Sequence, residues 1–167
     1  QDTSSMLAVE AAGIRTLLPN GNRNLKQDKK LSKTKEQVDS IPKVADEFLV
    51  LDVCAAPGGK SLYAAELLGS DGCVVSRDLT EYKVSFIRDN IDRMKLTNIK
   101  AEIWDALIPD ETWIEKADVV LADLPCSGLG IMGKKRDIRY RSTPDKLKEL
   151  AELQKQILSV IWQYVKP

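Results

Sequence analysis

Residues 51–61, LDVCAAPGGKS, place a cysteine, two adjacent glycines and a lysine directly after an apolar run. A phosphate-binding loop has the pattern G-x-x-x-x-G-K-[ST], whose first glycine opens the turn so that backbone N–H groups face the phosphates. Here Cys54 stands where that glycine belongs, and Pro57 removes one backbone donor. A nucleotide-hydrolysing enzyme stays an alternative, since VVLAD (119–123) imitates a Walker-B aspartate. The pattern nevertheless favours a loop for another kind of cofactor.

The acids that follow this loop suit a nucleoside cofactor. Gly58 and Gly59 let the backbone approach a ligand without a Cβ in the way. Asp78 ends a predicted strand about 20 residues past Gly58, where related folds use an acid to bind ribose hydroxyls. Asp105 ends the next predicted strand and can accept a hydrogen bond from an adenine amino group. Such acids repel a triphosphate and suit a positive centre, such as the sulfonium of S-adenosylmethionine.

A second reactive motif is ADLPCSGLG (122–130), which places Asp123 and Cys126 three residues apart. One interpretation is a turn with a small buried thiol, because cysteine is often buried and inert. The other is an accessible thiol on a loop stiffened by Pro125, where a thiolate beside bound substrate is a nucleophile for addition chemistry. From the residues alone, Cys126 is the candidate nucleophile.

A local cluster of basic residues follows in KKRDIRYR (134–141), where a tyrosine lies among five cations and one acid. Cations interleaved with an aromatic ring are typical of surfaces that bind a nucleic-acid backbone. A solvated charged loop is the competing interpretation. The cations are Lys134, Lys135, Arg136, Arg139 and Arg141.

Composition excludes several other classes of site. The 167-residue chain is 43% hydrophobic and 30% charged with zero formal net charge, as expected of one globular domain. It contains no histidine, which excludes Ser-His and Cys-His pairs and histidine-ligated metals. The cysteines Cys54, Cys73 and Cys126 form no CxxC pair, so we expect no metal, no disulfide and a reducing, cytoplasmic setting. No apolar stretch approaches the roughly 18–20 residues that span a bilayer, so no membrane partner is expected.

The chain divides into three segments. Residues 1–18 predict a helical segment, with a helix over 4–18 whose apolar stripe is Met6, Leu7, Ala11, Ile14 and Leu18. Residues 19–47 are polar and lysine-rich, which favours a mobile surface insertion, although its lysines offer a second possible RNA contact. Residues 48–167 alternate between strand-like and helix-like patterns.

This alternation predicts a Rossmann-like α/β fold with a doubly wound, mostly parallel sheet. Strands are expected at 48–54, 73–78, 99–105 and 117–125, and helices at 60–68, 80–94 and 142–165. Ligands of such sheets bind beyond the carboxyl ends of the strands, near the switch point of the strand order. The residues at those ends, which we expect to converge, are Cys54, Asp78, Asp105 and Asp123.

The combination of QDTSSML, LDVCAAPGGK, ADLPCSGLG and GKKRDIRYRSTPD resembles the RNA cytosine-5 methyltransferases of the Nol/Nop/Sun family. The likeness is greatest to the bacterial small-subunit (16S) ribosomal RNA methyltransferase B group, and it covers residues 1–18 and 48–167. It implies an S-adenosylmethionine-dependent enzyme that methylates C5 of a cytosine in ribosomal RNA. The cofactor contacts that it implies are Cys54, Ala55, Ala56, Pro57, Gly58, Gly59, Lys60, Asp78, Asp105 and Asp123.

The resemblance also assigns the catalytic roles differently from the residues alone. In this family a thiolate in a Thr-Cys motif after the fifth strand adds to C6 of cytosine. Asp123 stabilises charge on the ring, and the thiol matching Cys126 helps to release the product. The sequence ends at 165–167, where a fifth strand would begin, and contains no Thr-Cys pair. We therefore expect a fragment truncated at both ends that lacks the last strands and is inactive by itself.

Two further expectations accompany this interpretation. Without the last strands, the fourth strand becomes an open sheet edge, and such edges pair with other chains, so a dimer through this edge is possible. The alternatives to the methyltransferase are an NTPase with a phosphate-type loop, or an RNA-binding module with a vestigial cofactor site.

Overall fold

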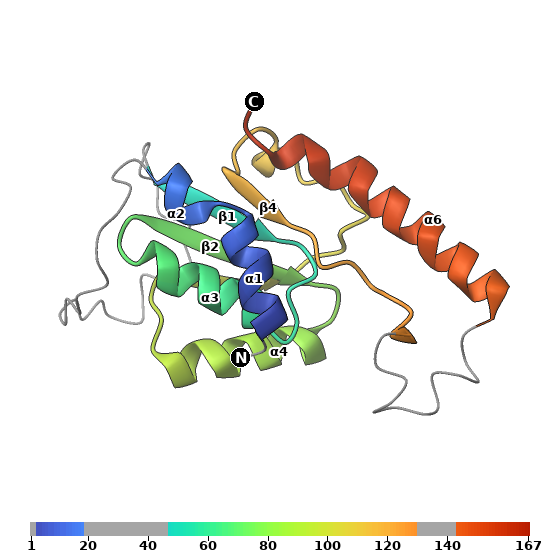
Figure 1. The fold of residues 1–167 in the computed structure, drawn as a ribbon, viewed down its shortest axis with the longest axis horizontal. Coiled ribbons are helices and arrows are strands. Elements are labelled where there is room, and N and C mark those ends of the chain that lie inside the picture. The colour runs from blue at the N-terminus through green and yellow to red at the C-terminus, as the bar shows by residue number, and fades with distance from the viewer. Residues whose placement is uncertain (1–2, 19–46, 130–142) are drawn as a thin grey trace.

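The structure, a computed structural model, describes residues 3–18, 47–129 and 143–167. The predicted surface insertion at 19–47 lies outside the described residues except for Glu47. The three described ranges pack into one sheet with helices on both faces (Figure 1).

Within the described residues, four parallel strands form one sheet in the order β3-β2-β1-β4. The strands are β1 (Phe48–Asp52), β2 (Gly72–Asp78), β3 (Ile99–Ile103) and β4 (Val119–Leu121). In β2 every residue is buried, as expected for a strand covered on both faces. The strand order reverses beside β1, because the chain moves from β1 through β2 to β3 and then crosses to β4. The predicted parallel α/β sheet is thereby confirmed, with its switch point between β1 and β4.

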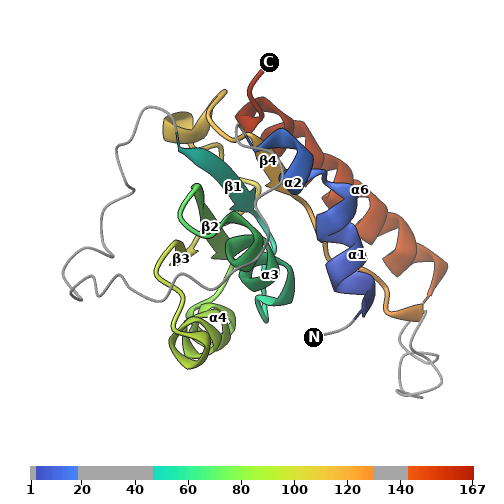
Figure 2. The ribbon, with the colours of Figure 1, turned by 60° about the vertical axis from the view of Figure 1, so that its left-hand side comes forward.

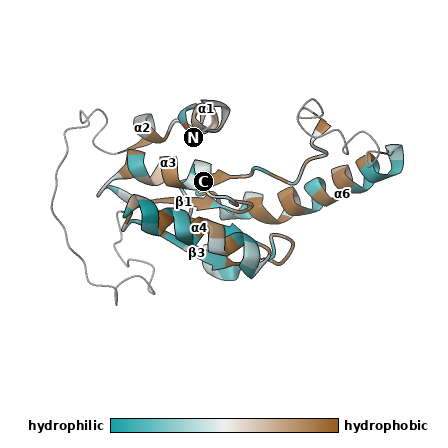
Figure 3. Cartoon of the chain, turned by 90° about the horizontal axis from the view of Figure 1, so that it is seen from below, coloured by the Kyte–Doolittle hydropathy of each residue, from teal (hydrophilic) through white to brown (hydrophobic). Residues whose placement is uncertain are grey.

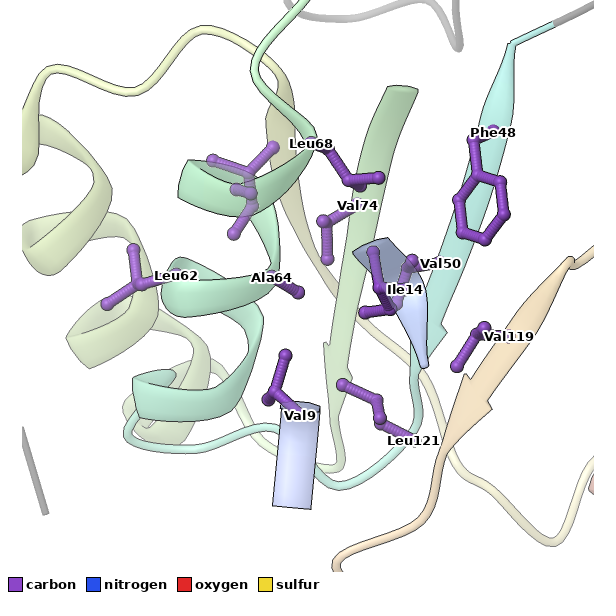
Figure 4. Packing of buried hydrophobic residues seen from close by; sticks show 12 residues of the cluster. Val9, Ile14, Phe48, Val50, Leu62, Ala64, Leu68, Val74, Val119 and Leu121 are labelled. Atoms are coloured by element: carbon purple, nitrogen blue, oxygen red, sulfur yellow. The ribbon is translucent and has the colours of Figure 1, made fainter. Parts of the chain in front are cut away.

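The helices cover the two faces of this sheet, as Figures 1 and 2 show. They are α1 (Thr3–Ala11), α2 (Ile14–Leu17), α3 (Gly59–Leu68), α4 (Glu81–Met94) and α6 (Pro144–Ile161), with 3-10 turns η2 (Glu111–Trp113) and η4 (Trp162–Tyr164). On one face, Val9 and Ile14 belong to a buried cluster with Leu62 of α3 and Val50 of β1, and Figure 4 shows Ile14 beside Val50. On the other face, α6 packs Ile157 and Ile161 against a cluster that includes Leu51 and Trp113.

The N-terminal segment differs from the single helix predicted over 4–18. The helix α1 ends at Ala11, and Gly13 adopts a left-handed backbone with φ of 69° before α2 begins at Ile14. This turn reorients the second helix, so Val9 and Ile14 are the fully buried residues and Leu7 is 63% exposed. The predicted stripe was therefore wrong at Leu7 and Ala11, which are exposed, and it omitted the buried Val9, because it assumed one straight helix.

The predicted helix over 142–165 is shorter in the structure and partly uncovered. Thr143 caps it through an Oγ1 that accepts a hydrogen bond from Lys146 N, and the helix ends at Ile161. Leu147, which was predicted to be part of the buried stripe, is exposed. The N-terminal half of α6 extends past the sheet in Figure 1, and in Figure 3 hydrophobic and hydrophilic turns alternate along the helix.

The strand β4 lies at one edge of the sheet, as predicted, but it spans only Val119–Leu121 of the expected 117–125. Just before it, Ala117 forms a parallel bridge with Val165, with Lys166 N donating to Ala117 O at 2.8 Å. Across the described ranges, no helix combines the length and apolar character that a membrane span requires.

Candidate functional site

The loop between β1 and α3 lies at the switch point of the sheet and turns on a glycine. Gly58 has φ of 102°, and a Cβ added there would lie 3.3 Å from Ile87 Cγ2. At Gly59, by contrast, an added Cβ would meet nothing within 4 Å. The first turn of the ten-residue helix α3 therefore presents bare backbone to open space. Backbone N–H groups at such a helix start bind negatively charged or polar ligand atoms.

Asp78, at the end of β2, connects the second strand to this loop. Its carboxylate accepts hydrogen bonds from Ala56 N at 3.0 Å, Leu79 N at 2.8 Å and Lys83 Nζ at 2.9 Å. The preceding residue, Arg77, accepts a hydrogen bond from Ala55 N through its carbonyl at 2.9 Å. Because the carboxylate is only 5% exposed, these contacts fix both its own position and that of the loop.

Asp123, in the loop after β4, contacts the first turn of α3. Its Oδ2 pairs with Lys60 Nζ at 2.7 Å, across the switch point. The Asp123 side chain is 60% exposed, whereas that of Lys60 is 21% exposed. An exposed pair of this kind contributes at most about 1 kcal/mol to stability, so a ligand can replace either partner at small cost.

Asp105 lies in the turn that follows β3, next to the end of β2. The neighbouring Trp104 N donates to Asp78 O at 3.0 Å, which joins the two strand ends. Within the turn, Asp105 Oδ1 accepts from Leu107 N and the Asp105 carbonyl accepts from Ile108 N, both at 2.9 Å. The second Asp105 carboxylate oxygen accepts no hydrogen bond from the described residues, which leaves it available to a ligand.

Sequence reasoning missed Asp52, the last residue of β1, which lies under the loop. It is 1% exposed, and its Oδ2 accepts a 2.6 Å hydrogen bond from Ser61 Oγ. Burial raises the pKa of Asp52 to about 6, although the hydrogen bond from Ser61 and the charge of Lys60 oppose that shift. The available signal was a single acid in the otherwise apolar run FLVLDVC, since an isolated buried charge is costly.

The cysteines lie in different environments. Burial, followed by the charges of Asp78 and Asp52, raises the pKa of Cys54 to about 11, so this residue is a neutral thiol at pH 7. Cys73 is buried in β2, and burial also raises its pKa to about 11. Cys126 is exposed on the loop that follows β4, where Gln154 Nε2 donates to Pro125 O at 2.7 Å. Exposure contradicts the interpretation of Cys126 as a buried thiol.

The predicted convergence at the strand ends can now be compared with these contacts. Cys54, Asp78 and Asp123 surround the β1 loop, and Asp105 is joined to them through the backbone of Asp78. The predicted RNA contacts Lys134, Lys135, Arg136, Arg139 and Arg141 lie outside the described residues and stay a prediction. Over the ranges that the structure describes, no group of three or more cysteines and acids is placed to hold a metal ion.

Chemically, this edge of the sheet combines hydrogen-bond acceptors, bare backbone and one ammonium group. Asp78 and Asp105 accept hydrogen bonds, Gly59 leaves room beside the helix start, and Lys60 offers a positive charge. Such a set can hold a molecule that has hydroxyl and amino donors at one end and a carboxylate at the other.

Similar sequences are found among curated bacterial proteins. The chain is 48% identical over 118 residues to the probable ribosomal RNA small subunit methyltransferase B of Bacillus subtilis (strain 168), which covers 70% of this chain and 26% of that protein. It is 38% identical over 120 residues to the ribosomal RNA small subunit methyltransferase B of Vibrio cholerae, covering 71% of this chain and 27% of that protein. The chain thus spans about a quarter of the length of these relatives.

Solved structures share the fold and the family model shares the sequence pattern. A methyltransferase homologue from Pyrococcus horikoshii matches with a TM-score of 0.60 and 30% identity, covering 72% of this chain and 37% of that one. NSun6 from the same organism, solved with SFG, matches with a TM-score of 0.70 and 23% identity over 99% of this chain and 34% of that one. The family model described as 16S rRNA methyltransferase RsmB/F matches residues 40–167. Because that match covers most of the sequence, the chain belongs to the 16S rRNA methyltransferase RsmB/F family.

Proposed function

We propose that this chain forms the S-adenosylmethionine site of an enzyme that methylates C5 of a cytosine in ribosomal RNA, a cytoplasmic reaction. The observation that carries the proposal is the buried Asp78 carboxylate bonded to the backbone of the CAAPGGK loop. A buried acceptor beside bare glycine backbone, at the switch point where such sheets bind nucleosides, supports a role for Asp78 in binding ribose hydroxyls. The methyltransferase names of the relatives support the same reaction class.

The residues present fit this cofactor from end to end. Asp78 accepts from the ribose hydroxyls, and Asp105 uses its remaining oxygen to accept from the adenine amino group. Lys60 exchanges Asp123 for the carboxylate of the amino-acid tail, and Gly59 leaves the space that the tail needs. When bound, the cofactor supplies a methyl group on a positively charged sulfur, which the surrounding carboxylates favour electrostatically.

The roles of the catalytic residues follow from the chemistry of cytosine. C5 is a poor nucleophile, so the thiolate of the family's Thr-Cys motif would form a bond to C6 and push electron density onto C5. C5 would then take the methyl group as its bond to sulfur breaks and S-adenosylhomocysteine leaves. A base would then take the C5 proton, which restores the C5–C6 double bond and breaks the C6–S bond to release the thiolate. Asp123 stabilises charge at N3 and N4 during the addition. The exposed Cys126 is assigned to product release, while Cys54 holds its proton at neutral pH and lines the cofactor.

The experiment that tests the proposal is calorimetric titration of the chain with S-adenosylhomocysteine and, separately, with ATP and Mg²⁺. We expect S-adenosylhomocysteine to bind and ATP to produce no heat of binding, because the acids around the loop repel a triphosphate. Binding of ATP without binding of S-adenosylhomocysteine would establish the NTPase alternative instead.

A pair of variants separates a working cofactor site from a vestigial one. Asp78→Asn loses the charged acceptor and should weaken S-adenosylhomocysteine binding by tenfold or more, roughly the value of one charged hydrogen bond. Asp89→Asn, the same exchange on the exposed side of α4, should bind as the unchanged chain does. Equal affinities for the two variants would contradict the assignment of Asp78.

A further inference from the structure

A buried cation lies on the opposite face of β2 from Asp78. Arg77 is 4% exposed, although it carries a full charge. Its Nε donates to Glu102 Oε1 and its Nη2 to Asp110 Oδ2, both at 2.7 Å. The guanidinium also lies over the ring of Trp104, with its carbon 4.8 Å from the ring centroid, and over that of Trp113 at 5.3 Å.

The partners of Arg77 enclose the turn that carries Asp105. Trp104 precedes this turn, and its Nε1 donates to Ile108 O at 2.9 Å. This hydrogen bond links the start of the turn to its end. Asp110 follows the turn, and its backbone N donates to Tyr164 Oη at 2.9 Å. Arg77 therefore contacts the residues on both sides of the turn, while the turn itself holds the Asp105 carboxylate.

The same residue also contacts the β1 loop. The Arg77 carbonyl accepts from Ala55 N, and the next residue, Asp78, accepts from Ala56 N. Arg77 thus holds the CAAPGGK loop with its backbone and the Asp105 turn with its side chain. Its Nη1 is buried and has no hydrogen-bond partner among the described residues, so the guanidinium is held by fewer bonds than it can make.

A guanidinium is suited to this position in a way that an ammonium group is not. Its planar fork reaches two carboxylates in fixed directions and stacks on aromatic rings, whereas lysine offers a compact charge on a flexible stem. Although burial raises the pKa of Asp110, hydrogen bonds from Thr112 and Arg77 outweigh it and hold that pKa below its ordinary value, so the pair stays charged. The ion pair between Arg77 and Asp110 is therefore retained at neutral pH.

We propose that Arg77 is a positioning residue that sets the Asp105 turn against the CAAPGGK loop and thereby selects adenine as the base of the cofactor. The inference rests on the proposed function, because it takes Asp105 as the acceptor for the adenine amino group. The juxtaposition that supports it is a single buried fork joined to Glu102, Trp104 and Asp110 around that turn.

The test compares two ligands that differ only in the base. S-inosylhomocysteine carries an oxygen where S-adenosylhomocysteine carries the amino group, so a correctly placed Asp105 prefers the adenine form. We expect the unchanged chain to bind the adenine ligand about tenfold more tightly. In Arg77→Lys the ratio of the two dissociation constants should fall towards one, while Arg88→Lys, an exposed exchange on α4, should leave it unchanged.

A second variant keeps the test decisive where Arg77→Lys does not fold. Trp104→Phe retains a ring over the guanidinium but removes the donor to Ile108 O, so it should also lower the base preference. Hydrogen exchange gives a readout without ligand. The amides of Leu107 and Ile108, which bond to Asp105, should exchange about tenfold faster in either variant, while that of Val74 in the core stays protected.

The outcomes separate the two proposals. If the unchanged chain binds no S-adenosylhomocysteine, the proposed function fails and this inference fails with it. If it binds both ligands equally, or if both variants keep the full base preference, the cofactor site stands and the role of Arg77 is overturned. An equal loss of affinity for both ligands, with the ratio retained, would show that Arg77 supports only the fold.

Discussion

Asp52 is the acid whose environment in this site differs most from water. Its carboxylate is buried under the β1 loop with one hydrogen bond from Ser61, and its Oδ1 has no partner among the described residues. Removal from water disfavours the charged form, which is why its pKa rises from 3.8 to about 6. The folded state therefore binds this proton more tightly than the unfolded chain does.

The raised pKa predicts how stability depends on pH. Where the folded state binds more protons than the unfolded state, the free energy of unfolding falls as pH rises, so the stability that this group confers below pH 4 is lost through pH 6. Asp52 should thus lower the free energy of unfolding by about 1.4 kcal/mol between pH 5 and pH 8. Asp52→Asn has no such proton, so its stability should lack this change. Measured by urea unfolding, the free energy of unfolding of the unchanged chain minus that of Asp52→Asn should fall by this amount from pH 5 to pH 8. Parallel pH dependences would contradict the raised pKa.

The residues of the site differ in how well the sequence predicts them. The positions of Asp78, Asp105 and Asp123 at one edge of the sheet could be predicted because each lies at the end of a predicted strand, and parallel strands bring their carboxyl ends together. The role of Asp52 could not, because it depends on its partner Ser61 in the next helix. The sequence indicates Arg77 only as part of a strand, because its partners lie 25 and 33 residues further along the chain.

The turn from β1 into α3 contains two adjacent glycines that have different roles. Gly58 has a left-handed backbone and touches Ile87, so Gly58→Ala should destabilise the fold by about 1–3 kcal/mol. Gly59→Ala adds a methyl group to open space on ordinary backbone and should stabilise by about 0.5 kcal/mol. Thermal unfolding measures both effects.

The same pair of variants separates stability from binding. Because the open space beside Gly59 is where we place the cofactor tail, Gly59→Ala should weaken S-adenosylhomocysteine binding roughly tenfold despite its higher stability. If Gly59→Ala binds the ligand as tightly as the unchanged chain does, the cofactor does not bind at this helix start.

The type and order of the elements were predictable from apolar periodicity, whereas their ends were not. The strand expected over 117–125 spans three residues, because the chain leaves the sheet to form the loop with Asp123. The break at Gly13 escaped prediction, since glycine inside an apolar pattern is compatible with a helix. Leu147 matched the stripe of α6, but only the tertiary arrangement shows that the sheet does not reach it.

At the scale of the whole molecule, β4 leaves one side of the sheet able to pair. Beyond it, the described residues provide only the bridge between Ala117 and Val165. Edges of this kind pair with other chains, so we predict self-association that sedimentation equilibrium detects as concentration rises. The alternative is self-association through the end of α6, where the side chain of Trp162 is 69% exposed. Trp162→Gln should leave association through the edge intact, and loss of association would place the contact on the helix.

The proposed contact of this chain with RNA depends on local charge, because the formal net charge of the sequence is zero. The predicted patch at 134–141 holds five cations, and the lysine-rich segment at 19–47 is the competing source of contacts. Each cation that neutralises a phosphate of single-stranded RNA contributes about 0.7 to the slope of log affinity against log salt. Replacing the five cations of 134–141 with glutamine should therefore lower both the affinity and this slope, by up to about 3.5.

A matched variant provides the control for total charge. Replacing five lysines of the other segment with glutamine changes the net charge by the same amount, and we expect its salt slope to equal that of the unchanged chain. The lysines are Lys26, Lys29, Lys30, Lys33 and Lys35. Fluorescence anisotropy with a mixed-sequence single-stranded RNA, measured across a salt series, compares the three proteins. Salt slopes that are reduced equally in the two variants would mean that overall charge governs binding. A reduced slope for the lysine variant alone would place the RNA on residues 19–47. The expected result, a reduced slope for the 134–141 variant alone, ties RNA binding to the segment between the Asp123–Cys126 loop and α6.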